Sequence, residues 1–391
     1  MTLVRATRIF FNLKNQNMAF TASLMPDIVL GVNEIFNAPN TVDARYSQEV
    51  GVAPALLTKQ TARTQERLTN GTCVGIKVWF YDAGASNTIY EGSELDSSLA
   101  CDNGACGVGQ TAGKDIDNNI FFHDCKAAQE DRCNNELDFA TETARVLYHL
   151  MYNMRVALSK RFINTLMLAA QQNQVVLPSY MTERSGSNII QIDKDNFTDS
   201  TIWNTIVDLG ILAQQNGILD PIILNGRNFQ NSSILAQFNG LNDNERSQPA
   251  IYNTLGRNMV WDIHSTAGID AITTELSTIL VSPNTYLFWN YTLFPTIPVM
   301  KDPSINLWNF SIADPILRYN ANGVIRPVMY DVEHTYECTG YDSAGNRIYL
   351  HNYRLFLRGG FTLAPLGYNM AGSSQVYTGT MHFVQNANSN S

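Results

Sequence analysis

A long amphipathic helix is the strongest pattern of apolar and polar positions in this chain. Between Asn135 and Gln172 the sequence contains no glycine and no proline. Apolar residues recur there at helical spacing, at Ala140, Ala144, Leu147, Met151, Met154, Leu158, Phe162, Leu166 and Ala169. At about 1.5 Å of rise per residue the helix would be longer than ~50 Å. We expect a strut rather than a core element, and its predicted packing residues are Leu147, Met151, Met154 and Leu158.

Alternating hydrophobicity predicts two strands before this helix. Residues 72–82 alternate in the manner of a strand, and NNIFFHD (118–124) is a second candidate. The segment between them is rich in Gly, Ser, Asn and Asp, and it is longer than compact domains usually tolerate without a function. We therefore expect the two strands to pair as a long hairpin that projects from the body. Residues 1–70 show only a short helix in MPDIVLGVNEIF (25–36) and read as an arm that needs partners.

The second half of the chain mixes helical and strand patterns. A second helix is expected over 201–217, ending at a glycine, and a short one over 231–243. PIILNGRNF (221–229) predicts a buried strand, and strand segments follow over 277–290. From Trp308 onward the alternating segments predict an antiparallel set, with Gly345 at a hairpin turn. These patterns together indicate an α+β fold, and the tail NANSNS is polar enough to be disordered.

The composition limits the classes of partner that this chain is expected to bind. Only 16% of the residues are charged and the formal net charge is −9, which argues against a dedicated nucleic-acid binder. Arg155, Lys160 and Arg161 are local basic positions that can still meet phosphate. No apolar run approaches the length of a membrane span, and we expect no membrane partner.

Four cysteines lie close together in the sequence before the long helix, two of them between the predicted strands and two after the second strand. Cys101, Cys106, Cys125 and Cys133 are spaced C-x4-C, C-x18-C and C-x7-C. A zinc site is one interpretation, but its second pair is too widely spaced for the usual pattern. We favour disulfides, chiefly Cys101–Cys106 and Cys125–Cys133, each contributing about 2–4 kcal/mol in a particle that oxidises after leaving the cell. Free, partly buried thiols remain open as the third alternative.

Motifs of catalysis or cofactor binding do not fit the sequence. GVGQTAGK (107–114) has valine at position 108 and is followed by Asp115, so it departs twice from a phosphate-binding loop. DKDNFTD (193–199) has a phenylalanine where a calcium loop needs an oxygen ligand. The six histidines form no zinc-protease pattern, and no nucleophile elbow is present. We therefore expect no enzyme, catalytic residue, cofactor or metal. A cytosolic α/β or zinc enzyme that uses His123, Asp124 and the cysteines is the less favoured alternative.

Taken in order, these elements resemble the major capsid protein of tailed bacteriophages, with its Hong Kong 97 type fold. The resemblance implies an N-terminal arm over 1–70, an extended β-hairpin loop over 71–128, and a spine helix with the first part of a peripheral domain over 129–205. An axial domain would follow over 206–310, and 311–391 would be a β-rich return to the peripheral domain with a C-terminal tail. RPVMYDVEHTYEC (326–338) resembles capsid proteins of phages that infect Bacteroidetes-like hosts.

The resemblance also implies a function. Such a chain would assemble into the hexamers and pentamers of an icosahedral shell around double-stranded DNA, which it would contact non-specifically. It would reside in the virion capsid after assembly in the host cytoplasm. Neighbouring capsid subunits would be its main partners, with decoration, portal and scaffolding proteins as further ones. Another virion structural protein and an encapsulin-like shell protein are the related alternatives.

Overall fold

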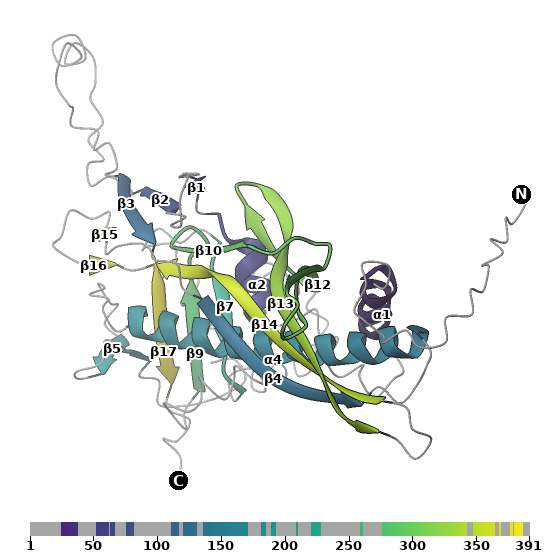
Figure 1. The fold of residues 1–391 in the computed structure, drawn as a ribbon. Coiled ribbons are helices and arrows are strands. Elements are labelled where there is room, and N and C mark those ends of the chain that lie inside the picture. The colour runs from purple at the N-terminus through teal and green to yellow at the C-terminus, as the bar shows by residue number, and fades with distance from the viewer. Residues whose placement is uncertain are drawn as a thin grey trace, which may run out of the picture.

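The computed structural model describes about half of the chain, which contains one long helix, two short helices and four sheets (Figure 1). The described residues are 25–37, 52–61, 63–66, 76–81, 111–116, 120–130, 136–170, 181–184, 189–192, 209, 220–227, 259–260, 276–341, 347–363, 367–368, 376–377 and 379–385.

The long helix is confirmed almost to its predicted ends. Helix α4 spans Glu136–Ala170, and all nine residues of the predicted stripe are buried. The expected role as a mere strut is wrong, because a second set of side chains is buried as well, including Tyr148, Leu150 and Ile163. Helices and strands cover α4 on several sides, so it is a central part of the core. No helix among the described residues is both long and apolar enough to cross a membrane.

Two helices of the predicted N-terminal arm pack within the body. Helix α1 (Met25–Asn37) confirms the short helix predicted there, and α2 (Val52–Lys59) was missed. Gly31 of α1 lies against α4, where a side chain carbon at this glycine would be 3.0 Å from Cβ of Ala144. In α2, Val52, Ala53, Leu56 and Leu57 join the same hydrophobic core as α4.

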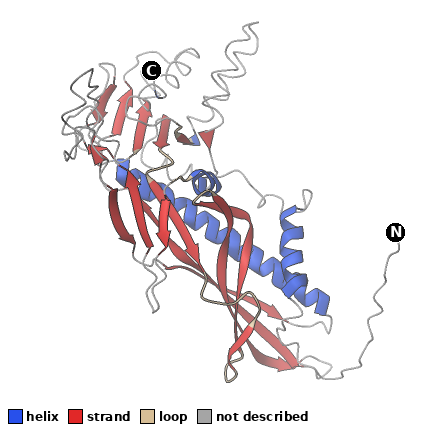
Figure 2. Ribbon diagram, turned by 90° about the horizontal axis from the view of Figure 1, so that it is seen from above, coloured by secondary structure: helices blue, strands red, loops and turns tan. Residues whose placement is uncertain are grey.

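A sheet of unusually long strands runs along α4 (Figure 2). Its strands are β4 (Ile120–Glu130), β10 (Tyr286–Tyr291), β11 (Val299–Asp302), β12 (Leu307–Ala321), β13 (Val324–Tyr341) and β14 (Arg347–Leu363). The order is β10-β14-β13-β12-β11, with β4 also paired to β14, and every pairing is antiparallel. At about 3.3 Å per residue the 15 to 18 residues of β12, β13 and β14 extend for about 50–60 Å, far beyond a usual strand. The antiparallel set predicted after Trp308 is confirmed.

The hairpin before α4 forms with a different second strand from the one predicted. Strand β2 (Ile76–Tyr81) pairs on one side with β1 (Arg63–Glu66) and on the other with β3 (Thr111–Ile116). The expected partner, 118–124, instead begins β4 and joins β14 of the long sheet. Strand β3 reads TAGKDI and has no hydrophobic alternation, so its pairing left no signal in the sequence.

A mixed sheet lies at the C-terminal end of α4, where β17 contacts the helix (Figure 1). Its order is β5-β6-β17-β9-β7-β8. The strands are β5 (Met181–Arg184), β6 (Ile189–Ile192), β7 (Ile222–Asn225), β8 (Met259–Val260), β9 (Leu276–Val281) and β17 (Thr380–Gln385). The predicted buried strand in PIILNGRNF is confirmed as β7, whose four residues are all buried. A further pair, β15 (Gly367–Tyr368) and β16 (Val376–Tyr377), stands apart.

Gly359 allows β10 to approach β14 closely, and its replacement gives a first prediction. A Cβ atom at Gly359 would lie 2.1 Å from the carbonyl oxygen of Trp289, a backbone atom that cannot turn aside. We expect Gly359→Ala to lower the free energy of unfolding by about 1–3 kcal/mol, as overpacking does elsewhere. Gly340→Ala is the matched control, because a Cβ atom there meets nothing within 4 Å. Urea unfolding of both variants checks this, and equal midpoints would contradict it.

Candidate functional site

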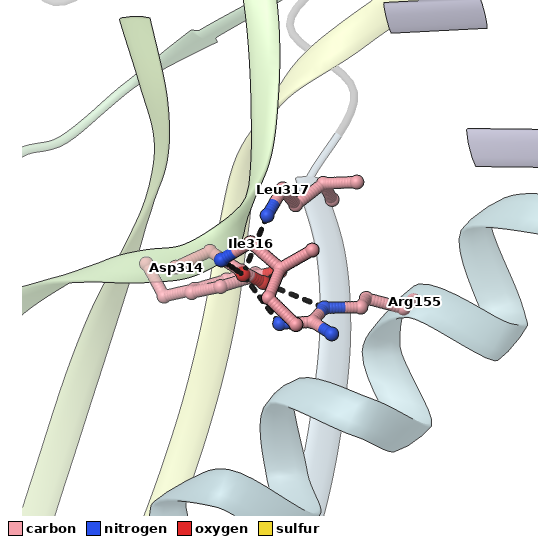
Figure 3. A network of polar contacts seen from close by, with 5 residues as sticks. Arg155, Asp314, Ile316 and Leu317 are labelled. Carbon is pink, nitrogen blue, oxygen red and sulfur yellow. Dashed lines mark hydrogen bonds and ion pairs between the residues drawn. The ribbon is translucent and has the colours of Figure 1, made fainter. Parts of the chain in front are cut away.

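A buried ion pair ties α4 to the long sheet (Figure 3). Asp314 lies in β12 where the register with β13 shifts, between Ala313 and Arg318. Its carboxylate accepts hydrogen bonds from Nε and Nη2 of the Arg155 guanidinium, with Nε 2.9 Å from Oδ2. The Tyr330 hydroxyl donates to the same Oδ2 at 2.8 Å. The carboxylate therefore has a cation and a hydroxyl as partners within the core.

Backbone amides complete this cluster. The amides of Ile316 and Leu317 donate to Asp314 Oδ1 at 2.9 and 2.8 Å, so Asp314 also caps the irregular turn of its own strand. Burial disfavours the charged guanidinium of Arg155, but the neighbouring Asp314 outweighs burial and raises the pKa of Arg155. Arg155 is buried, so the expectation that it can meet phosphate is wrong; Lys160 and Arg161 are exposed.

Two histidines contact each other in the core near the N-terminal end of α4. His334 Nε2 and His351 Nδ1 are 2.9 Å apart, and the two rings stack with 5.2 Å between centroids. Phe139 of α4 and Tyr353 of β14 enclose them. Burial lowers the pKa of His351 to about 4. The pKa of His334 falls well below its usual value, first through burial and then through His351. Both rings are therefore neutral near pH 7.

A third buried histidine joins two strands of the mixed sheet. His382 Nε2 in β17 lies 2.7 Å from the Ser277 hydroxyl in β9. Burial lowers the pKa of His382 to about 4. The burial of these rings suits stability near neutral pH, because a second proton on a ring would bring a positive charge into the core, which burial disfavours.

A polar junction holds the loop between β10 and β11 against the long sheet. Asp331 of β13 accepts hydrogen bonds from the amides of Leu293 and Phe294 at 3.0 and 3.2 Å, and pairs with Arg358 Nε at 2.6 Å. The Asn290 side chain bridges β13 and β14, where these strands separate, through Met329 and Arg358. The loop between β10 and β11 is therefore held in place, although it carries the exposed apolar side chains of Leu293 and Ile297.

Most of the exposed large apolar side chains of the described surface gather in three regions. The first covers the β10–β11 loop, β11 and the turn after it: Leu293, Ile297, Val299, Met300 and Ile305. The second is the tip of the β12–β13 hairpin, Val324 and Ile325, and the third is α1, Val29 and Leu30. Strand β11 is also an edge of its sheet. Apolar patches at a sheet edge and at element tips mark surfaces for protein contacts.

The predicted site residues fall into two groups. Leu147, Met151, Met154 and Leu158 are each at most 2% exposed and pack in the core around α4. Cys101, Cys106 and Cys133 lie outside the described residues, and Cys125 lies in β4, whose side chains the structure does not describe.

Other expected features also lie outside the described residues. They are the calcium-like segment 193–199, the helices expected at 201–217 (except Leu209) and 231–243, Gly345 and the tail. Within the described part, no three metal-binding side chains come together.

The burial of Arg155 and of His334 was missed, although the sequence contains a signal for each. Arg155 follows Met154 and lies four residues after Met151, on the apolar side of the helix. His334 alternates with Tyr330 and Val332, two buried residues of the inward face of β13. A charged or titratable residue on an otherwise apolar face implies a buried partner.

Comparison with known proteins gives structural matches alone. No family model matches the chain, and no curated protein matches it. The capsid of Ralstonia phage GP4 is 8% identical, with a TM-score of 0.41 over 88% of this chain and 93% of that one. The capsid of Myoviridae phage XM1 is 11% identical, with a TM-score of 0.31 over 84% of this chain and 87% of that one. The acidic stable capsid structure of Helicobacter pylori bacteriophage KHP30 is 9% identical, with a TM-score of 0.35 over 97% of this chain and 100% of that one. All three are structures of phage capsids.

Proposed function

We propose that this chain is a virion structural protein, the major capsid protein of a tailed phage with the Hong Kong 97 type fold. Its copies form the hexamers and pentamers of an icosahedral shell, assembled in the host cytoplasm, that encloses double-stranded DNA. The observation that carries the proposal is the 35-residue helix α4 with strands of 15 to 18 residues running along it. The β2–β3 hairpin precedes this unit, as the order of elements in that fold requires.

The shape of the body supports a role in assembly. A helix of about 52 Å beside strands of similar length makes an elongated body, which offers much surface for its volume. Three separate regions of that surface carry exposed apolar side chains, and they lie on different elements. Heterologous contacts between different surfaces of identical subunits close rings around local axes, which is how hexamers and pentamers form.

The interior supports a structural role as well. The charged groups in the core, Arg155, Asp314 and Asp331, are each engaged in an ion pair that joins elements of the fold. The buried histidines contact other side chains of the core. Neighbouring subunits are thus the partners to which the described residues are best suited, with packaged DNA and decoration, portal and scaffolding proteins as further ones.

Electron microscopy of the purified chain tests this proposal. We expect concentrated protein in negative stain to form shells, capsomer rings or tubes, and light scattering to rise with protein concentration. A reference sample at low concentration gives the unassembled species. A homogeneous monomer or dimer at every concentration tested would contradict the proposal.

A further inference from the structure

The outward face of α1 combines apolar and acidic side chains. Its inward face, with Ile28 and Val32, is buried against the body. On the opposite face, Leu30 is 56% and Val29 39% exposed. Glu34 lies one turn beyond Leu30 on the same side of the helix, so the apolar ridge ends beside a carboxylate.

The tip of the β12–β13 hairpin combines apolar and basic side chains. Val324 is 56% and Ile325 50% exposed, and the exposed Arg326 follows them. Arg318, opposite Pro327 on the neighbouring strand, is exposed as well. A two-residue turn shapes this tip.

That turn makes the tip rigid. Asn322 and Gly323 have φ angles of 54° and 90°, and Ala321 pairs directly with Val324, as in a type I′ turn. The Asn320 side chain also accepts a hydrogen bond from the Gly323 amide at 2.8 Å. A tip that is already ordered loses little conformational entropy when it binds a partner.

The two surfaces belong to different parts of one molecule. Helix α1 crosses α4 at Ala144. The hairpin end lies beside α2, since Gln60 just after α2 donates a hydrogen bond to the Asn320 carbonyl. Figure 1 shows α1 and α2 over separate stretches of α4. Among the described residues, Glu34, Arg318 and Arg326 form no ion pair.

We infer that the β12–β13 tip of one copy docks on the outward face of α1 in a second copy. Val324 and Arg326 lie on the same face of β13, so Val324 would cover Leu30 while Arg326 faces Glu34. Ile325, on the other face, would lie beside Val29. The surfaces are complementary in charge and both are apolar at their centre, which is the arrangement that specifies protein partners. Because the two surfaces differ, each copy can give a tip to one neighbour and receive a tip from another. This inference rests on the proposed shell function and names one contact within it.

Charge reversal on each surface tests the contact. The variants are Glu34→Lys, Arg326→Glu and the double variant with both changes, and Lys160→Glu on the exposed side of α4 is the control. We expect each single reversal to raise the protein concentration at which light scattering detects assemblies by about tenfold, since like charges would then meet. The double variant should return to within about threefold of wild type, and the control should behave as wild type.

The outcomes separate this inference from the function on which it rests. Wild-type protein that never assembles would overturn both. Wild-type assembly together with single variants that assemble equally well would overturn the inference alone. Weakened single variants without recovery in the double variant would also overturn it, because those charges would then face another partner. Near-ultraviolet circular dichroism of the unassembled variants should match wild type, so that lost assembly is not lost folding.

Discussion

Arg155→Met is expected to lower the free energy of unfolding by about 3–5 kcal/mol, the usual cost of leaving one member of a buried ion pair without the other. The change removes the cation that faces Asp314, while the carboxylate stays in the core with only Tyr330 and two amides as donors. Methionine fills much of the space of the arginine stem, so the loss comes mainly from the charge rather than from a cavity.

Three further variants locate the origin of that loss. Arg155→Lys keeps the charge but cannot donate two parallel hydrogen bonds, and an intermediate loss is expected. The double variant Arg155→Met/Asp314→Asn removes both charges and should recover part of the stability. Arg145→Met on the same helix breaks an exposed pair with Glu142 and should cost less than about 0.5 kcal/mol. Urea unfolding measures all four, and a loss for Arg155→Met no larger than for Arg145→Met would contradict the prediction.

Local pattern was sufficient to predict the elements whose signal is long and regular. The 35 residues of α4 form about ten helical turns, contain no glycine or proline, and carry apolar residues at helical spacing. The same spacing places these residues on the faces of the helix that pack in the core. Strands β12 to β14 carry regularly recurring apolar residues as well, and the buried ones join the same core as α4. By contrast, α2 contains only eight residues and two turns, too few for a period to stand out from the polar run that follows.

Strand pairing and buried polar contacts depend on residues far apart in the chain. Strand β4 pairs with β14, more than two hundred residues later, and nothing in IFFHDCK distinguishes that partner from β2. Asp314 and Arg155 meet 159 residues apart, and only the fold brings the kink of β12 over that turn of α4. The Asn322-Gly323 turn was within reach of the sequence, because this dipeptide between two strands is a strong hairpin signal.

Acid is expected to destabilise the folded chain through its buried histidines. The pKa of His351 and of His382 is about 4 in the folded protein, against about 6.5 when the chain unfolds. Between these values the unfolded state binds more protons than the folded state, so stability falls as the pH drops below 6.5. The loss is complete near pH 4 and amounts to about 3 kcal/mol for each histidine. His334, whose pKa is lowered further, adds to this in the same direction.

Substitution separates these histidines from the carboxylates that also titrate in acid. His382→Asn keeps a group that can hydrogen-bond to Ser277 but takes up no proton, and its stability should depend less on pH than that of wild type. His149→Asn is the matched control, since His149 lies on the exposed side of α4. The measurement is the free energy of unfolding of unassembled protein at pH 7.5 and at pH 4.5. We expect His382→Asn to lose about 2–3 kcal/mol less than wild type between these pH values, because its folded state no longer resists protonation there. An equal loss in wild type and His382→Asn would show that carboxylates alone govern the response to acid.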